Sequence, residues 1–429
     1  MTGQAARAWT GQITIPRTCA PRRHRLHPAR PVVAENQPGA GVRVGFTKTA
    51  MQNDFTAYAV RLREFIRRHS PDTAPCDRIE PEESANEFAA LADELFRLQF
   101  AANEPFRALC RARGVSPATL TDWRDLPAVP TEAFKEAELT CLAPTERTSV
   151  FHSSGTTRQR PSRHFHSAES LALYEASLRP WFQQNLLGTF DEPTGKNPFP
   201  PKKKPLFVAL TPLPAAVPHS SLAHMLGVVL REFGAPDSLF TGVLDADGTW
   251  SLDLDGLLSI ARQSVRANRP LILLGTAFNF VHLLDHFAAN TIGCRLAAGS
   301  HVMETGGYKG RSREMPKAEL HALITRQLGI PRAHIVTEYG MSELSSQAYE
   351  AAPGSFHFPP WAQAQVISPE TGREVAEGET GRLRILDLAN AWSVLAVQTG
   401  DLAIRRGPGF ELLGRAASVE ARGCSLLAA

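Results

Sequence analysis

A loop rich in hydroxyl groups and basic side chains is the first segment whose composition indicates chemistry. Residues 153–157 are Ser-Ser-Gly-Thr-Thr, and Arg158, Arg160 and Arg163 follow them. The loop lies between an apolar segment typical of a strand and a predicted helix that begins near Ser167. Backbone N–H groups, hydroxyls and guanidinium groups are the donors that hold phosphate oxygens in proteins. The loop is therefore a candidate phosphate site, although no Walker lysine follows it, and taken alone it also fits a plain surface turn.

Four further segments, in order along the chain, carry groups that suit a nucleotide. Residues 303–310 form a glycine turn, and residues 338–343 (Glu-Tyr-Gly-Met-Ser-Glu) follow a predicted strand. Asp401, in Thr-Gly-Asp-Leu, is predicted at a strand junction, and Gly414 and Arg415 come thirteen and fourteen residues later. Glycine lets a flat ring approach the backbone, and a carboxylate can accept both hydroxyls of a vicinal diol. The plain structural alternative for Asp401 is an aspartate that caps a turn.

The predicted secondary structure around these residues is helical in the N-terminal part of the chain and alternates between strands and helices further on. An apolar stripe predicts a helix over 55–68, and a second is predicted to start at the cap Ser84, break near Pro105 and stop at Gly114. Beyond Pro205, apolar runs alternate with helical segments at 278–288 and 317–328. The predicted strands are 206–211, 271–276, 334–337, 383–386 and 394–397. This alternation predicts an α/β fold with a sheet that is buried on both faces.

Charge and composition exclude several classes of protein. The 429 residues carry a net charge of +3, but residues 1–50 hold eight Lys or Arg and one acid. This basic charge lies in a Pro-rich segment without apolar periodicity, so it predicts a disordered tail and gives no argument for nucleic-acid binding. No signal-peptide pattern and no long apolar run is present, so we expect no membrane span. The six scattered cysteines fit the reducing cytoplasm.

The motifs together resemble the adenylate-forming superfamily of acyl-CoA synthetases, luciferases and peptide-synthetase adenylation domains. This resemblance rests on four motifs in this order: the SSGTT loop, the YGMSE segment, the TGDL segment and the Gly-Arg pair. Within the superfamily the chain is similar to the LuxE-type acyl-protein synthetases. The added matches are residues 129–135 (VPTEAFK), 161–164 (PSRH), 306–310 (GGYKG) and 420–426 (EARGCSL). The resemblance covers about residues 52–426 and leaves residues 1–50 unexplained.

The resemblance implies a role for each matched residue in binding ATP and Mg²⁺. Ser153, Ser154, Gly155, Thr156 and Thr157 would hold the β- and γ-phosphates, and Glu343 would bind Mg²⁺. Adenine would lie against Tyr339 and the backbone of Gly306 and Gly307. Asp401 would accept the ribose hydroxyls, with Arg415 as a nearby donor. Arg158 stands where the superfamily usually has glycine, either stiffening the turn or adding a phosphate ligand, and Ala417 replaces the hinge aspartate.

The same resemblance implies the large N-terminal domain of an adenylate-forming enzyme, with layered sheets flanked by helices. We expect a tail (1–50), an adenylate-forming domain (51–413) and a short C-terminal segment (414–429). Because the sequence stops shortly after Gly423, most of the C-terminal lid and its catalytic lysine are expected to be missing. Lys135 or Lys309 is the expected substitute cation, although each also fits an ordinary surface lysine.

Cys424 is the expected acyl acceptor because the family carries a cysteine close to its C-terminus. A thiolate attacks acyl-adenylates well, and Arg422 would lower its pKa. Nine residues separate Arg415 from Cys424, a span of at most ~30 Å, so the thiol can reach the adenylate. The alternative is a terminal thiol without a role. Cys110, on a predicted helix face, and Cys294, after a glycine turn, are weaker candidates.

The predicted function is ATP-dependent activation of a carboxylic acid, expected to be a fatty acid, followed by thioester formation on the protein. An acyl reductase or acyltransferase would be the partner that takes the acyl group. Two alternatives stay open at this point. One is an acyl- or aryl-CoA ligase of the phenylacetate type, and the other is a non-catalytic member of the fold.

Overall fold

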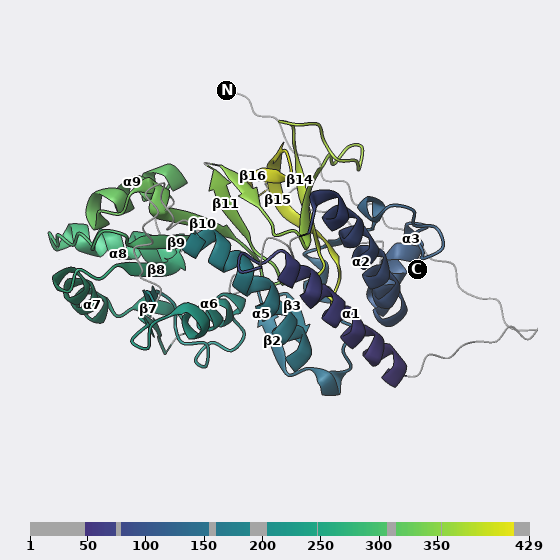
Figure 1. Cartoon of the computed structure of the whole chain (residues 1–429), viewed down its shortest axis with the longest axis horizontal. Helices are drawn as coiled ribbons and strands as arrows, with labels where there is room; N and C mark the ends of the chain where they lie inside the picture. Colours follow the sequence, from purple (N-terminus) through teal and green to yellow (C-terminus); the bar gives the residue numbers. More distant parts are fainter. Residues whose placement is uncertain are drawn as a thin grey trace, which may run out of the picture. The chain divides into compact units, whose positions relative to one another are not determined.

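The computed structural model describes residues 48–73, 79–153, 160–188, 204–246, 248–306, 315–352 and 354–415 (Figure 1). All of them belong to one compact unit, Phe46–Ala429. The helices in these ranges are α1 (Lys48–Arg68), α2 (Pro81–Ala102), α3 (Glu104–Ala112), α4 (Ala133–Glu136), α5 (Ala168–Phe182), α6 (Ser221–Phe233), α7 (Leu254–Arg266), α8 (Ala277–Ala289) and α9 (Lys317–Leu328). None of them is long and apolar enough to cross a membrane.

One twelve-stranded sheet dominates the part of the chain that the structure describes. Its parallel half runs β5 (Leu239–Phe240), β4 (Leu206–Ala209), β8 (Leu271–Thr276), β9 (His301–Thr305) and β10 (Ile335–Tyr339). Its antiparallel half continues through β11 (Ala348–Ala352), β12 (Ser355–His357), β16 (Gly409–Arg415), β15 (Ala396–Arg406), β14 (Thr380–Asp387) and β13 (Ala362–Ile367). Strand β1 (Val129–Pro130) pairs in parallel with β15. Strand β10 is therefore the boundary between the two halves.

Two short hairpins stand apart from this sheet. The first pairs β2 (Ser149–His152) with β3 (Arg163–His166), and the second pairs β6 (Gly242–Leu244) with β7 (Trp250–Leu252). The β2–β3 hairpin carries the hydroxyl-rich loop between its strands. The predicted α/β class is confirmed by this mixture of sheets and flanking helices.

The parallel half is buried on both faces, as its continuous apolar strands predict. Along β8, Leu271 and Leu273 face a core shared with α7, α8 and α9, whereas Ile272 and Leu274 face a core shared with α5 and α6. This division follows from the two-residue repeat of a strand, which points successive side chains to opposite faces. The carboxyl ends of β9 and β10 are thereby fixed between two helical layers.

The predicted helices at 278–288 and 317–328 correspond to α8 and α9, but the N-terminal helices differ in their ends. Helix α1 begins at Lys48, before the predicted residue 55. Helix α2 begins at Pro81 rather than at Ser84, because proline favours the first helical position and two glutamates occupy the first turn. The Ser84 hydroxyl instead lies 2.8 Å from His69 Nε2. The predicted break near Pro105 occurs at Asn103, whose side chain accepts the Phe106 N–H.

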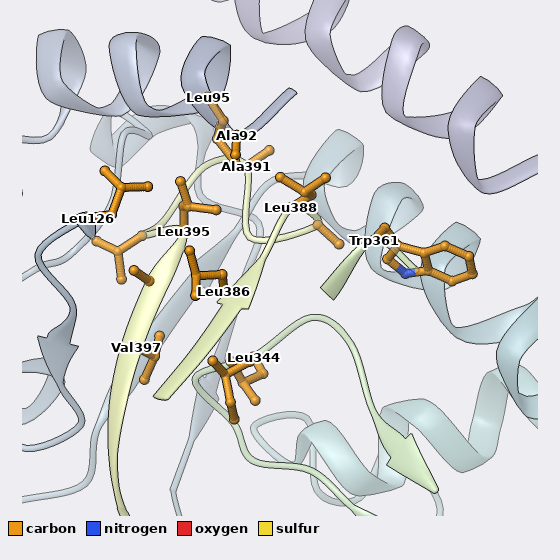
Figure 2. Close-up of a cluster of buried hydrophobic side chains, with 14 of the residues drawn as sticks. Ala92, Leu95, Leu126, Leu344, Trp361, Leu386, Leu388, Ala391, Leu395 and Val397 are labelled. Atoms are coloured by element: carbon orange, nitrogen blue, oxygen red, sulfur yellow. The ribbon is translucent and has the colours of Figure 1, made fainter. Parts of the chain in front are cut away.

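A third core joins α1, α2 and α3 to the antiparallel half of the sheet. Figure 2 shows Ala92 and Leu95 of α2 beside Ala391 and Leu395, which lie in the connection between β14 and β15. We call residues 388–395 the buried connection, because every one of them is at most 5% exposed. The apolar run 394–397 was predicted as a strand, but only its last two residues lie in β15. An apolar run alone does not distinguish a buried loop from a strand.

Candidate active site at the end of strand β10

Tyr339, Asp401 and Arg415 come together at the boundary strand. Tyr339 ends β10, and its hydroxyl donates to Asp401 Oδ2 at 2.8 Å. Asp401 and Arg415 are cross-strand neighbours on β15 and β16, with 3.7 Å between Arg415 Nε and Asp401 Oδ1. Asp401 was predicted at a strand junction. It lies instead within β15, where the pairing with β14 shifts register between Arg382 and Arg384.

The Asp401 carboxylate is partly buried in an environment of mixed charge. Burial raises its pKa, whereas the hydrogen bond from Tyr339 and the charge of Arg415 lower it. The charge of Glu132 raises it further. The backbone N–H of Asp401 donates to Thr399 Oγ1 at 3.1 Å, which fixes the strand at this point. Arg415 is 90% exposed, so its guanidinium is open to a ligand.

The Tyr339 ring is buried among aromatic neighbours, with edge contacts to Phe356, Phe358 and Phe410 at centroid distances of 5.4–6.3 Å. Gly306 follows β9. Because Thr305 pairs with Glu338, Gly306 lies beside Tyr339 at the carboxyl ends of β9 and β10. Its φ of +65° is in the left-handed region, and a Cβ there would meet no atom of the described residues within 4 Å.

Glu343 lies in the loop after β10 and is 6% exposed. Ser342 Oγ donates to Glu343 Oε2 at 3.1 Å. In the ranges that the structure describes, no cation is paired with this carboxylate and no group of three or more ligand side chains could hold a metal ion. Mg²⁺ bound with a nucleotide typically takes one or two protein carboxylates and completes its shell with phosphate oxygens and water. A single buried carboxylate without a counter-ion fits that requirement.

The β2–β3 hairpin is tied directly to the Glu343 loop. His164 of β3 hydrogen-bonds through Nδ1 to the Ser342 carbonyl at 2.9 Å. Burial lowers the pKa of His164 to about 4, so near neutral pH the ring is uncharged and Nδ1–H is the donor. His164 directly follows Arg163, which pairs with His152 at the open end of the hairpin. The stem of the hydroxyl-rich loop is therefore fixed next to Glu343.

Several sequence-predicted residues fall outside the described ranges. Of the phosphate loop, the structure describes Ser153, whose Oγ accepts the Ser162 N–H at 3.0 Å. The predicted residues that lie outside the described ranges are Ser154, Gly155, Thr156, Thr157, Arg158, Gly307, Lys309 and Cys424.

Lys135 lies on α4, in a segment that runs beside β15. The Thr131 N–H donates to the Gln398 carbonyl at 3.1 Å, which continues the β1–β15 pairing toward Asp401. Glu132, at the same turn, is near enough to influence the pKa of Asp401. The sequence did not predict that Glu132 lies near Asp401, because the parallel pairing of 129–130 with 397–398 joins residues about 270 positions apart.

A buried carboxyl next to the site also escaped sequence analysis. Glu338 is fully buried at the end of β10 and accepts a short hydrogen bond from Thr305 Oγ1. Burial and the charge of Glu304 raise the pKa of Glu338 to about 7, although the Thr305 hydrogen bond opposes this shift. This pair connects the Gly306 turn to the strand that carries Tyr339.

The cysteines at 110 and 294 are buried. Cys110 packs on α3, and burial raises its pKa to about 12. Cys294 is 6% exposed, and its pKa is also raised by burial. Neither is suited to act as a thiolate nucleophile near neutral pH.

The arrangement of the sheet and its flanking helices is the fold of the adenylate-forming ligases. Two crystal structures of 2-hydroxyisobutyryl-CoA ligase in complex with 2-HIB-AMP and CoA match with TM-scores of 0.55 and 0.58. The first is an open conformation and the second is the thioesterification state. The matches cover 77% and 81% of this chain and 70% of each ligase, at 14% identity. At this identity the similarity shows the fold alone.

The C-terminal part of the sequence is similar to a known family. Residues 237–429 match the family described as acyl-protein synthetase, LuxE. The long-chain-fatty-acid–luciferin-component ligase of Aliivibrio fischeri is 24% identical over 172 residues, which are 37% of this chain and 45% of that protein. The chain thus matches less than half the length of this relative. The resemblance to LuxE-type synthetases that the motifs predicted is confirmed by these matches.

Proposed function

We propose that the protein activates a carboxylic acid with ATP and transfers the acyl group to its own Cys424 thiol. The acid carboxylate attacks the α-phosphorus of ATP, and the bond to the β-phosphate breaks with release of pyrophosphate. The Cys424 thiolate then attacks the acyl carbonyl and releases AMP, while the thiol proton passes to solvent. The observation that carries the adenylation step is the convergence of Tyr339, Asp401 and Arg415 in an adenylate-forming fold.

The nucleotide is proposed to bind across the boundary strand. Asp401 would accept the ribose hydroxyls, Arg415 would add a donor, and adenine would lie at Tyr339 and the turn of Gly306 and Gly307. A carboxylate suits this role because its two oxygens can each accept one O–H. The contact of Asp401 with both Tyr339 and Arg415 and the exposure of the Arg415 guanidinium support the assignment, because an exposed donor next to the carboxylate can reach a bound ribose.

The phosphates are proposed to bind at the loop between β2 and β3. Ser153, Ser154, Gly155, Thr156, Thr157 and Arg158 would surround the β- and γ-phosphates, and Glu343 would bind Mg²⁺. When bound, the ion would neutralise charge on the departing pyrophosphate. The His164 contact with Ser342 supports this arrangement, because it fixes the hairpin stem next to the Glu343 loop. Lys135 or Lys309 would supply a further cation to the triphosphate.

The acid is proposed to be a fatty acid, and the acceptor a protein thiol. The name of the Aliivibrio fischeri relative contains a long-chain fatty acid, and the family match extends across Cys424. The acylated protein would then deliver its acyl group to a reductase or acyltransferase. The second candidate function is a CoA ligase, which the CoA complexes of the fold relatives favour.

Two experiments test the two halves of the proposal. Pyrophosphate exchange is measured with short, long and aromatic acids, with and without CoA. Exchange with none of the acids would refute the enzyme class, and formation of free acyl-CoA would favour the second candidate.

The acceptor is tested by incubating the protein with ATP and labelled acid. We expect label that survives denaturation, is removed by neutral hydroxylamine and is lost in Cys424→Ser. The matched control is Cys294→Ser, which changes a buried thiol and should keep the label. Label that persists in Cys424→Ser would exclude this cysteine as the acceptor.

A further inference from the structure

The buried connection is held by side chains from the N-terminal helices. Gln99 of α2 donates to the carbonyls of Asn390 and Ala391 at 2.9 and 3.0 Å and accepts the Leu395 N–H at 2.8 Å. Tyr58 of α1 donates to the Leu388 carbonyl at 3.1 Å. Buried backbone groups need such partners because water cannot reach them. The connection is therefore a fixed part of the core despite its lack of regular secondary structure.

The same connection holds the Glu343 loop from the other side. Asn390 Nδ2 donates to the Glu343 carbonyl at 2.9 Å and to the Val394 carbonyl at 3.2 Å, and Asn390 Oδ1 accepts from Ser345 Oγ at 2.7 Å. The Asp387 carboxylate accepts the N–H groups of Ser345 and of the following residue, both at 2.8 Å. Each polar atom of the Asn390 side chain is therefore used.

Packing reinforces these hydrogen bonds. Leu344, next to Glu343, is 1% exposed and packs in the core with Leu386 and Val397 (Figure 2). Three contacts thus hold the main chain on the C-terminal side of Glu343. They are the packing of Leu344 in the core and the hydrogen bonds from Asn390 and to Asp387. The Glu343 carboxylate accepts a hydrogen bond from Ser342 Oγ and pairs with no cation in the described ranges.

We propose that Asn390 is a positioning residue that sets the place of the Glu343 carboxylate through the Glu343 main-chain carbonyl. The inference rests on the proposed function, in which Glu343 binds the nucleotide-associated Mg²⁺. Groups that orient a metal ligand commonly change metal affinity by about 10–100-fold when they are replaced. In this proposal Asn390 orients the metal-binding residue Glu343, although Asn390 lies on the buried connection and Glu343 lies in the loop after β10.

The test compares nucleotide binding with and without Mg²⁺, so that no turnover is needed. Asn390→Asp keeps the size of the side chain but replaces the donor to the Glu343 and Val394 carbonyls by an acceptor. The dissociation constant of α,β-methylene-ATP is measured by calorimetry in Mg²⁺ and in EDTA. In the wild type we expect Mg²⁺ to tighten binding, and in Asn390→Asp we expect this Mg²⁺ effect to fall about tenfold. Binding in EDTA should be unchanged.

A matched control separates positioning from general loss of stability. Tyr58→Phe removes one hydrogen bond from the same buried connection but none from the Glu343 loop, so it should lower Tm and keep the full Mg²⁺ effect. If Asn390→Asp does not fold, Ser345→Ala removes the donor to Asn390 Oδ1 and should reduce the Mg²⁺ effect about threefold.

The outcomes are distinguishable. An unchanged Mg²⁺ effect in the folded Asn390 or Ser345 variant, or an equal loss in Tyr58→Phe, would overturn the positioning role. A wild type that binds the nucleotide equally well in Mg²⁺ and EDTA would instead refute the assignment of Glu343 in the proposed function.

Discussion

Asp401 is the residue on which the proposed nucleotide site depends most. Asp401→Asn keeps the shape but removes the charge that strengthens hydrogen bonds from the ribose hydroxyls. We expect ATP affinity to fall by about 10–100-fold, since a hydrogen bond to a charged group contributes about 1.5–3 kcal/mol. The control is 2′,3′-dideoxy-ATP, which lacks both hydroxyls and should bind the wild type and the variant equally. An equal loss for both nucleotides would place the ribose elsewhere.

Glu338 is expected to make stability depend on pH. Its folded-state pKa of about 7 is above the ordinary value of 4.5, so the native state holds the proton more tightly than the unfolded chain. Its contribution to stability is therefore complete below about pH 4.5 and is lost as pH rises toward 7. Glu338→Gln cannot ionise. From pH 5 to pH 8 the free energy of unfolding of this variant should rise by up to about 3 kcal/mol relative to the wild type, as measured by denaturant titration. Parallel pH profiles would contradict the burial of an ionisable Glu338.

Helix α2 contributes to the fold through a hydrogen-bonding side chain as well as through its apolar face. Gln99→Leu would remove hydrogen bonds to three backbone groups of the buried connection. It would leave the Ala391 carbonyl and the Leu395 N–H without a partner among the described residues, whereas the Asn390 carbonyl still accepts the Ser393 N–H at 3.1 Å. We expect a loss of about 3 kcal/mol or more in the free energy of unfolding. The matched change Gln183→Leu removes a surface contact with Asp72 and should alter stability by less than about 0.5 kcal/mol. Similar effects for both variants would mean that the connection is hydrated.

The sequence could predict the elements of the parallel half because their signals are local. Strand β8 and helices α8 and α9 follow from apolar runs and helical stripes within the segments themselves. The role of residues 388–395 could not be predicted in this way. Their apolar run resembles a strand, and their hydrogen-bond partners on α1 and α2 lie about 290–330 positions earlier in the chain. The order of the motifs along the chain indicated which residues could form the site. It did not predict the hydrogen bond from Tyr339 to Asp401.

Across the whole molecule, the distribution of buried thiols limits which cysteine can become acylated. Cys110 and Cys294 lie in two different cores, one on each half of the sheet. Treatment of the native protein with iodoacetamide at pH 8 should leave both unmodified, because burial raises the pKa of each and blocks access. Both should react after denaturation in guanidinium chloride, as seen by peptide mass spectrometry. Rapid modification of either thiol in the native protein would contradict its burial and reopen it as an acceptor.

The buried connection also has a consequence for the order in which the protein can fold during synthesis. Tyr58 and Gln99 emerge from the ribosome early, but the carbonyls and the N–H that they bind are made roughly three hundred residues later. Until then α1 and α2 lack both their polar partners and much of their apolar contact surface. The N-terminal helices can thus complete their packing only after the buried connection has been made, although they are translated earlier. Nascent chains arrested before residue 380 should therefore remain open to protease at α2, whereas chains arrested well beyond 415 should be protected there.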